Sequence, residues 1–205
     1  LTDGDRNTAV GYQSFSALTT SGNTGGTAVG YKAGNALTSG GYNTIMGRDS
    51  LATATTASSC VVIGDSAMAN SPSGVNFSGI IAIGPSAMVD TSSLTNGANN
   101  TIAIGSGALN SLTSGARNTA IGYAAGDTLQ NGASNTIVGY GCDTDTTGRS
   151  DCVIIGDRIT LSIASDEVVE IGNATNSMTY DLGGGDITVS SDVRIKKDIE
   201  DTKIG

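Results

Sequence analysis

The segment Asn7-Thr8-Ala9-Val10-Gly11-Tyr12 returns as Gly26-Thr27-Ala28-Val29-Gly30-Tyr31, and edited copies of it follow almost to the end of the chain. Each copy closes on a glycine, and these coil glycines lie 16 to 21 residues apart. They are Gly11, Gly30, Gly47, Gly64, Gly84, Gly105, Gly122, Gly139, Gly156 and Gly172. A period of this size is typical of stacked arrays, in which each repeat buries its apolar face against its neighbours. The spacing therefore predicts a repeat protein that presents an extended surface.

Each copy also contains a short run of alternating β-branched and small residues, such as Thr8-Ala9-Val10 or Thr119-Ala120-Ile121. This period-two pattern is typical of a strand with one packed face. The coil glycine then permits a turn that other residues would adopt only with strain. A small residue follows three places later, and four copies carry a leucine four places beyond it: Leu18, Leu37, Leu112 and Leu129. We expect this stretch to form a second strand that returns along the other side of the coil.

Two strands per coil, joined by turns rich in glycine, serine, threonine and asparagine, predict an all-β fold, a β-solenoid of about ten coils. Ten rungs at the inter-strand spacing of about 4.8 Å would give a rod roughly 45 Å long. We further expect asparagines near the head of several copies to stack as a ladder of amides. These are Asn7, Asn23, Asn43, Asn100, Asn118 and Asn135.

A two-stranded coil of this size is expected to be too thin to shield its own interior. Small side chains such as Ala9 and Ala28 would let neighbouring backbones approach closely. We therefore expect several chains to wind around a common axis, as an obligate, intertwined homotrimer.

The composition of the 205 residues restricts the function. There are 30 glycines, no tryptophan and only 4% aromatic residues, which suits a thin core built in layers. The net charge is −9, and the ten lysines and arginines form no patch, so we expect no nucleic-acid partner. No apolar run has the length of a membrane span, so no membrane insertion is expected. Because Leu1 is not an initiator methionine, we expect the chain to be a fragment of a longer protein.

Metal and cofactor sites are not expected. Cys60, Cys142 and Cys152 are too few for a disulfide framework, and are expected to be small buried side chains. The chain has no histidine and no Cys-x-x-Cys pair, which argues against zinc. The segment Asp143-Thr144-Asp145 resembles the start of a calcium loop, but Ile154 stands where an EF-hand requires a bidentate glutamate.

Four tyrosines are the candidate binding residues, since each directly follows a coil glycine: Tyr12, Tyr31, Tyr123 and Tyr140. In adjacent coils they should stack, and an exposed aromatic ladder could hold a sugar chain. The alternative is packing at the turn or against a neighbouring subunit. Hydrolysis of glycans, which uses paired carboxylates, is a further alternative because acidic residues isolated in sequence can meet across coils. Those residues are Asp49, Asp65, Asp90, Asp127 and Asp157.

The repeated phrase Asn-Thr-Ala-Val-Gly-Tyr, with Ala-Gly and Leu-Thr-Ser-Gly after it, resembles the head repeats of trimeric autotransporter adhesins. The resemblance covers roughly residues 6 to 172. It implies a left-handed β-roll in each subunit and a trimer of three packed rolls. The coils of this chain are longer and more variable than the family pattern.

A second resemblance lies in Ser190-Ser191-Asp192-Val193-Arg194-Ile195-Lys196-Lys197-Asp198-Ile199. This stretch is similar to the start of the self-cleaving intramolecular chaperone, a peptidase family, at the C-terminus of bacteriophage tail fibres and tailspikes. The resemblance implies Ser191 as nucleophile, Lys196 as base, and a cut between Ser190 and Ser191. A lysine base must be neutral, so its pKa must be lowered by burial from the ordinary value of about 10.4. We expect no cleavage in this chain, because only about fifteen residues of the chaperone are present. A charged amphipathic helix over residues 192 to 201 is the alternative.

These observations predict three parts: a repeat β-solenoid over residues 1–172, a stranded neck over 173–190, and the start of the chaperone over 191–205. In the neck, 178–182 and 186–190 are expected to be strands around the turn 183–185. The expected function is that of a trimeric viral fibre on the virion surface, with a role in host attachment. Its expected partners are itself, a host surface glycan or protein, and other tail or capsid proteins. A bacterial adhesin head is the second interpretation, and a glycan-degrading tailspike the third. Beyond the single self-cleavage of a precursor, no enzymatic activity is expected.

Overall fold

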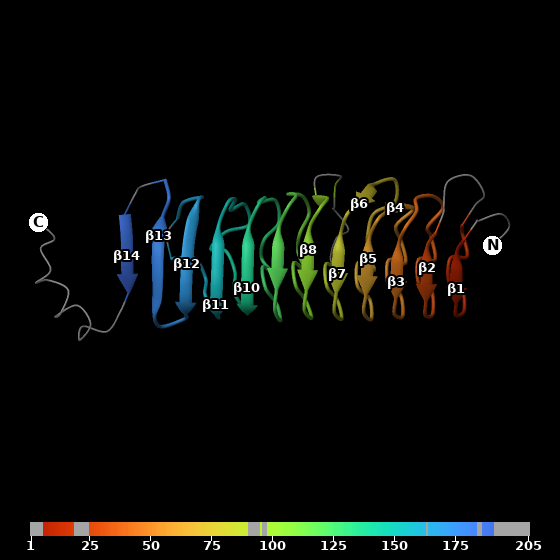
Figure 1. Cartoon of the computed structure of the whole chain (residues 1–205), viewed down its shortest axis with the longest axis horizontal. Helices are drawn as coiled ribbons and strands as arrows, with labels where there is room; N and C mark the ends of the chain where they lie inside the picture. The colour runs from red at the N-terminus through yellow and green to blue at the C-terminus, as the bar shows by residue number, and fades with distance from the viewer. Residues whose placement is uncertain are drawn as a thin grey trace, which may run out of the picture.

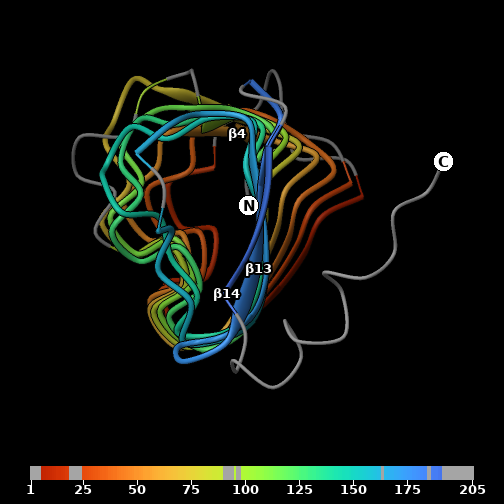
Figure 2. The ribbon, with the colours of Figure 1, turned by 90° about the vertical axis from the view of Figure 1, so that its left-hand side faces the viewer.

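The computed structural model describes residues 6–18, 25–89, 95, 98–162, 164–183 and 186–190. Within these residues the chain is all-β, without an α-helix, and its stacked parallel strands form a β-solenoid of about nine turns. The strands lie side by side in one row, with β1 and β14 at its opposite ends (Figure 1). Viewed from its end, the row appears as superimposed coils (Figure 2). The predicted solenoid is confirmed, with about one turn fewer than expected.

One long sheet of twelve strands runs the length of the described chain. Ten of its strands are parallel to their neighbours and contribute one rung per coil. Their bounds are β1 Thr8–Val10, β2 Thr27–Val29, β3 Thr44–Met46, β5 Val61–Ile63, β7 Ile81–Ile83, β8 Ile102–Ile104, β9 Thr119–Ile121, β10 Thr136–Tyr140, β11 Val153–Asp157 and β12 Val168–Asn173. The antiparallel strands β13 Ser177–Asp181 and β14 Asp186–Ser190 complete the row. Both strands predicted for the neck are therefore present, and they continue the long sheet.

The coil glycines set the register, because the strands pair so that every rung ends at the same place. Gly139 stands opposite Gly156, and Gly156 opposite Gly172. Gly122 has a φ of 139°, and a Cβ atom there would overlap the carbonyl oxygen of Gly139 in the next coil. Only glycine combines this backbone angle with so close an approach. The predicted role of the repeat glycine is confirmed.

The core lies inside the coils. The middle residue of most rungs points inward, as do the small residues three places after the coil glycine, which are buried from Ala33 to Cys142 with only Ser14 half-exposed. Ala28, in the middle of β2, has no exposed surface, and Ala9 packs on the same core. These alanines therefore fill the interior of their own coil. The expectation that one chain could not shield its interior is wrong, because the layers of small and branched side chains close the coil by themselves.

The predicted second strand after each coil glycine is absent from the described coils, where turns take its place. The residues two and four places after the glycine have positive φ, for example Gln13 (56°) and Phe15 (48°), or Ser66 (57°) and Met68 (49°). A backbone that enters the left-handed region at every second residue cannot extend as a strand. The turns still bond from coil to coil, since the Phe15 N–H donates to the Ala33 carbonyl at 3.1 Å. The four leucines of this stretch, Leu18, Leu37, Leu112 and Leu129, are buried in the core.

A second sheet exists only locally and in another part of the coil. Strands β4 (Thr56–Ser58) and β6 (Asn76–Ser78) pair in parallel and precede the rungs β5 and β7 of their own coils. The longer coil between Gly64 and Gly84 supplies β6. The other long coil, around residues 90–99, lies largely outside the described residues.

Buried asparagine amides connect the coils, as predicted. Asn118 and Asn135 are each 1% exposed, and the Asn135 Nδ2 donates to Asn118 Oδ1 at 3.0 Å. Each amide oxygen also accepts a backbone N–H of the next coil, as the Cys60 N–H to Asn43 Oδ1 bond shows. The assignment of Asn100 to the ladder is wrong: it is exposed, and Thr101 stands in the register position four places before Gly105. Asn7 makes the same bond to the Gly26 N–H, whereas Asn23 lies outside the described residues.

The outer face of the long sheet carries a continuous apolar column. The residue just before each coil glycine points away from the core, and pairing places these residues opposite one another from rung to rung. We call this the outer column; it consists of Val10, Val29, Met46, Ile63, Ile83, Ile104, Ile121, Val138, Ile155 and Ile171. All ten are half-buried or exposed, with Val10 at 56%.

Candidate functional site

The four candidate tyrosines form two stacked pairs. The rings of Tyr12 and Tyr31 have centroids 5.6 Å apart and an interplanar angle of 13°. Those of Tyr123 and Tyr140 are 5.1 Å apart at 14°. All four are exposed, so the predicted stacking is confirmed while ligand binding by these rings stays a prediction.

The ladder is interrupted because the four coils between the two tyrosine pairs have no aromatic residue after their glycine. Those coils carry Arg48, Asp65, Pro85 and Ser106 instead. Arg48 bonds Asp49 and Asp65 at 2.7 Å each, so this stretch of the surface holds an ion-pair cluster. The Tyr31 ring has Tyr12 stacked against it and the Lys32 ammonium 5.3 Å from its centroid. The two tyrosine pairs therefore differ in their surroundings.

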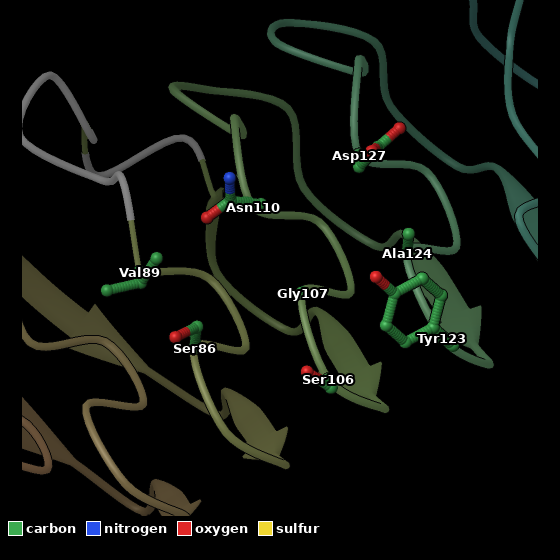
Figure 3. A pocket seen from close by; sticks show the side chains of 8 residues that line it. All are labelled: Ser86, Val89, Ser106, Gly107, Asn110, Tyr123, Ala124 and Asp127. Carbon is green, nitrogen blue, oxygen red and sulfur yellow. The ribbon is translucent and has the colours of Figure 1, made fainter.

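A hollow of about 330 Å³ lies beside Tyr123, along the turns that follow three successive coil glycines (Figure 3). Its lining comes from equivalent places in those coils: Ser86, Val89, Ser106, Gly107, Asn110, Tyr123, Ala124 and Asp127. The second place after the glycine holds Ser86, Gly107 and Ala124 here, a run of small residues that leaves the groove wide. At Gly107 an added Cβ would meet no atom within 4 Å. Two comparable hollows follow the same turns elsewhere, one around Lys32, Asp49 and Ser66 and one around Arg158 and Asn173.

The sequence did not predict Asn110 as a site residue, and it predicted Asp127 only as one of several isolated carboxylates. The Oδ1 atom of Asn110 is buried and has no hydrogen-bond partner among the described residues. Asp127 occupies the equivalent place in the next coil and contributes a carboxylate. Both stand five places after a coil glycine, so an alignment of the copies places them together. The sequence alone did not show that Asn110 and Asp127 lie close to Tyr123, because this proximity depends on the order in which the coils stack.

Asp127 also hydrogen-bonds Asp143 of the following coil. Asp143 is 6% exposed, and its carboxyl accepts the backbone N–H groups of Thr128 at 3.0 Å and Thr144 at 2.8 Å. Burial, together with the hydrogen bond that the protonated Asp143 carboxyl donates to Asp127, raises the pKa of Asp143 to about 7. Asp143 therefore keeps its proton over the acidic range. Asp127 is thus brought together with a second carboxyl, as was considered possible for the isolated acidic residues.

The remaining candidates have structural roles. Asp145 binds Arg149 through two bonds of 2.6 and 2.8 Å, which lowers the pKa of that carboxyl. In the part of the chain that the structure describes, no three Cys, Asp or Glu side chains gather in a way that could hold a metal ion. Cys60, Cys142 and Cys152 are free and buried, as expected of small core side chains.

The predicted self-cleavage residues Ser191 and Lys196 lie outside the described residues. Ser190 ends β14, the last strand of the long sheet, so the predicted cut would follow that strand directly. Asp90 also lies outside the described residues.

The chain matches no protein-family model, no curated protein and no solved structure. Among the described residues there is no helix with the length and apolar character needed to span a bilayer.

Proposed function

We propose that the chain forms the shaft or head of a bacteriophage tail fibre or tailspike, a homotrimer of left-handed β-rolls on the virion that contributes to host attachment. The observation that supports the assembly in this proposal is the outer column, and the resemblance of residues 190–199 supports the fibre. Its ten aligned apolar side chains extend for about 45 Å at the spacing of parallel rungs, and all ten are half-buried or exposed. Exposed apolar patches of this extent mark surfaces that associate with protein. The outer columns of a second and a third copy could cover this one, because identical chains carry apolar residues at the same spacing along the column.

The column is tested by the assembly state in solution. Sedimentation equilibrium should give three times the chain mass of 20.3 kDa. Ile121→Asp and Ile155→Asp place a charge on the column, at residues 39% and 38% exposed, and should yield smaller species. Gln130→Asp adds the same charge at an exposed residue away from the long sheet and should leave the trimer intact. A wild-type monomer at micromolar concentration would refute the assembly.

The distinction from a bacterial adhesin head depends on the segment after β14. In the proposal, Ser191 is the nucleophile and Lys196 the base of an intramolecular chaperone that cuts a precursor between Ser190 and Ser191. The intact mass of a precursor carrying a complete chaperone tests this. A product ending at Ser190, and its loss in Ser191→Ala and Lys196→Ala, would support the fibre. An adhesin head would instead be followed by a coiled-coil stalk and a membrane anchor.

A glycan-degrading spike is the less favoured function. Glycosidases hold two carboxyl groups about 5 to 10 Å apart, with room for substrate or water between them. Asp127 and Asp143 hydrogen-bond each other, and two backbone N–H groups hold Asp143. Two carboxyl groups in direct contact leave no room for substrate or water between them, so the pair does not fit the arrangement of a glycosidase. Oligosaccharide products released from host glycans would contradict this interpretation.

A further inference from the structure

We propose that the hollow beside Tyr123 binds one neutral pyranose unit of a glycan. The inference deepens the proposed function, on which it rests, by assigning a place and a chemical class to the host ligand. Its elements are an open aromatic ring, buried or fixed hydrogen-bond acceptors, and the absence of a cation in the lining (Figure 3).

The Tyr123 ring supplies a platform for a sugar. Tyr140, in the next coil, stacks on the ring at 5.1 Å, while the preceding coil has Ser106 at the equivalent place. The ring is 55% exposed and borders the hollow on that side. The face of an aromatic ring is electron-rich, and the C–H groups of a pyranose carry the opposite partial charge. A sugar ring lying in the hollow can therefore stack on the free face of Tyr123.

The polar atoms of the hollow favour a ligand rich in hydroxyl donors. Asn110 Oδ1 has no hydrogen-bond partner among the described residues, and an unpaired buried acceptor costs about 1 to 3 kcal/mol until a donor reaches it. The Asp127 carboxylate adds a second acceptor, and the hydroxyl groups of Ser86 and Ser106 can donate or accept. A pyranose presents several hydroxyl donors around one apolar ring face, which is the complement of this set.

The charge of the site excludes acidic sugars. Among the described residues, no lysine or arginine lines the hollow and Asp127 does, and the chain carries a net charge of −9. A sialic acid or uronic acid would place a carboxylate beside Asp127 without a cation to offset it. The hollow around Lys32 and Asp49 follows the equivalent turns of other coils but has no aromatic ring in its described lining, so it serves as an internal comparison.

Gly107 gives a variant that closes the hollow without removing a contact. Its φ is 69°, and Gln13 occupies the same place in its own coil with a φ of 56°. Gly107→Gln should therefore be accepted by the fold while its side chain fills the open space. Ser66→Gln is the matched control, because Ser66 stands at the same place with a φ of 57° in the other hollow. Tyr123→Ala removes the platform, and Tyr42→Ala removes a tyrosine of 71% exposure outside the hollow.

The test is saturation-transfer NMR with methyl pyranosides of glucose, galactose, mannose and N-acetylglucosamine, and with N-acetylneuraminic acid as the anionic probe. At least one neutral pyranoside should bind with a dissociation constant of about 1 mM, as expected for a ligand of a dozen atoms. Gly107→Gln and Tyr123→Ala should weaken that binding at least about tenfold, the effect of losing roughly 1.4 kcal/mol. Ser66→Gln and Tyr42→Ala should not change it.

The site would be refuted if the folded protein bound none of the neutral pyranosides, or bound N-acetylneuraminic acid more tightly. Equal losses in Ser66→Gln and Gly107→Gln would also refute it. Sedimentation on the same samples separates this result from the proposed function. A trimer that binds no pyranoside overturns the site alone, and a monomer that binds one supports the site while overturning the assembly.

Discussion

Replacement of Asn118 by threonine should destabilise the solenoid by about 3 kcal/mol. The Asn118 amide is 1% exposed and makes four hydrogen bonds. Its Nδ2 donates to the carbonyls of Gly115 at 3.0 Å and Gly132 at 2.8 Å. Its Oδ1 accepts the backbone N–H and the Nδ2 of Asn135, both at 3.0 Å. The shorter threonine side chain cannot span the same two coils.

The magnitude follows from the number of bonds. A buried hydrogen bond contributes about 1 kcal/mol net, and threonine can recover at most one of the four. For a domain of this size, about 3 kcal/mol lowers the melting temperature by roughly 6 to 12 °C. The chain contains the same situation at Thr101, which is fully buried and whose Oγ1 has no partner among the described residues.

Thr101→Asn is therefore the inverse experiment. By its register, an asparagine there would accept the Asn118 backbone N–H and donate to the Gly115 carbonyl, and should raise stability by about 2 kcal/mol. Circular dichroism melts at one fixed protein concentration would measure both variants, since assembly makes the melting temperature depend on concentration. A loss below 2 °C in Asn118→Thr, or a loss of stability in Thr101→Asn, would refute the role of the ladder.

Two further predictions concern the coil glycines and the buried carboxyl. Gly122→Ala should lower the stability by at least about 3 kcal/mol, because φ is 139° and the new Cβ would overlap the Gly139 carbonyl. Gly107→Ala, with a φ of 69° and open space around it, should lower the stability by at most about 2 kcal/mol. Thermal melts would measure both losses, and equal losses would contradict this. Because the pKa of Asp143 in the folded chain, about 7, is above its unfolded value, the folded state holds a proton that the unfolded state releases. Its contribution to stability is complete below about pH 4 and is lost as the pH rises through about 7. Urea midpoints at pH 4.5 and 7.5 should thus differ less in Asp143→Asn than in the wild type, and an unchanged difference would exclude this role.

The fold could be predicted from the sequence at positions where only one residue type suits the backbone conformation. A glycine at a fixed spacing, such as Gly122 or Gly139, marks a φ that other residues avoid, so the rungs and their register could be predicted. The turns that follow each coil glycine could not be predicted. Left-handed conformations are adopted there by Gln13, Phe15 and Ser66, residue types that do not mark such a conformation in the sequence. Packing of the coil as a whole imposes these angles.

The candidate site was predictable only in part, for a related reason. The stacking of Tyr123 on Tyr140 follows from their common place in adjacent coils. Three coils together form the hollow beside Tyr123. The hollow depends on the absence of large side chains from the two preceding coils, which carry Ser86 and Gly107 at this place. The error at Asn100 has the same origin, since one extra residue in a long coil moved the asparagine out of register and left Thr101 in its place.

The direction of the ladders determines how the rod responds to tension. Hydrogen bonds between rungs run along the stacking direction, so a pull on the two ends loads them in series, one coil after another. A single chain would then unwind coil by coil at modest force. Copies packed side by side along their outer columns would have to slide past one another before any coil could open. Lateral contacts between copies would therefore raise the force needed to unwind a coil.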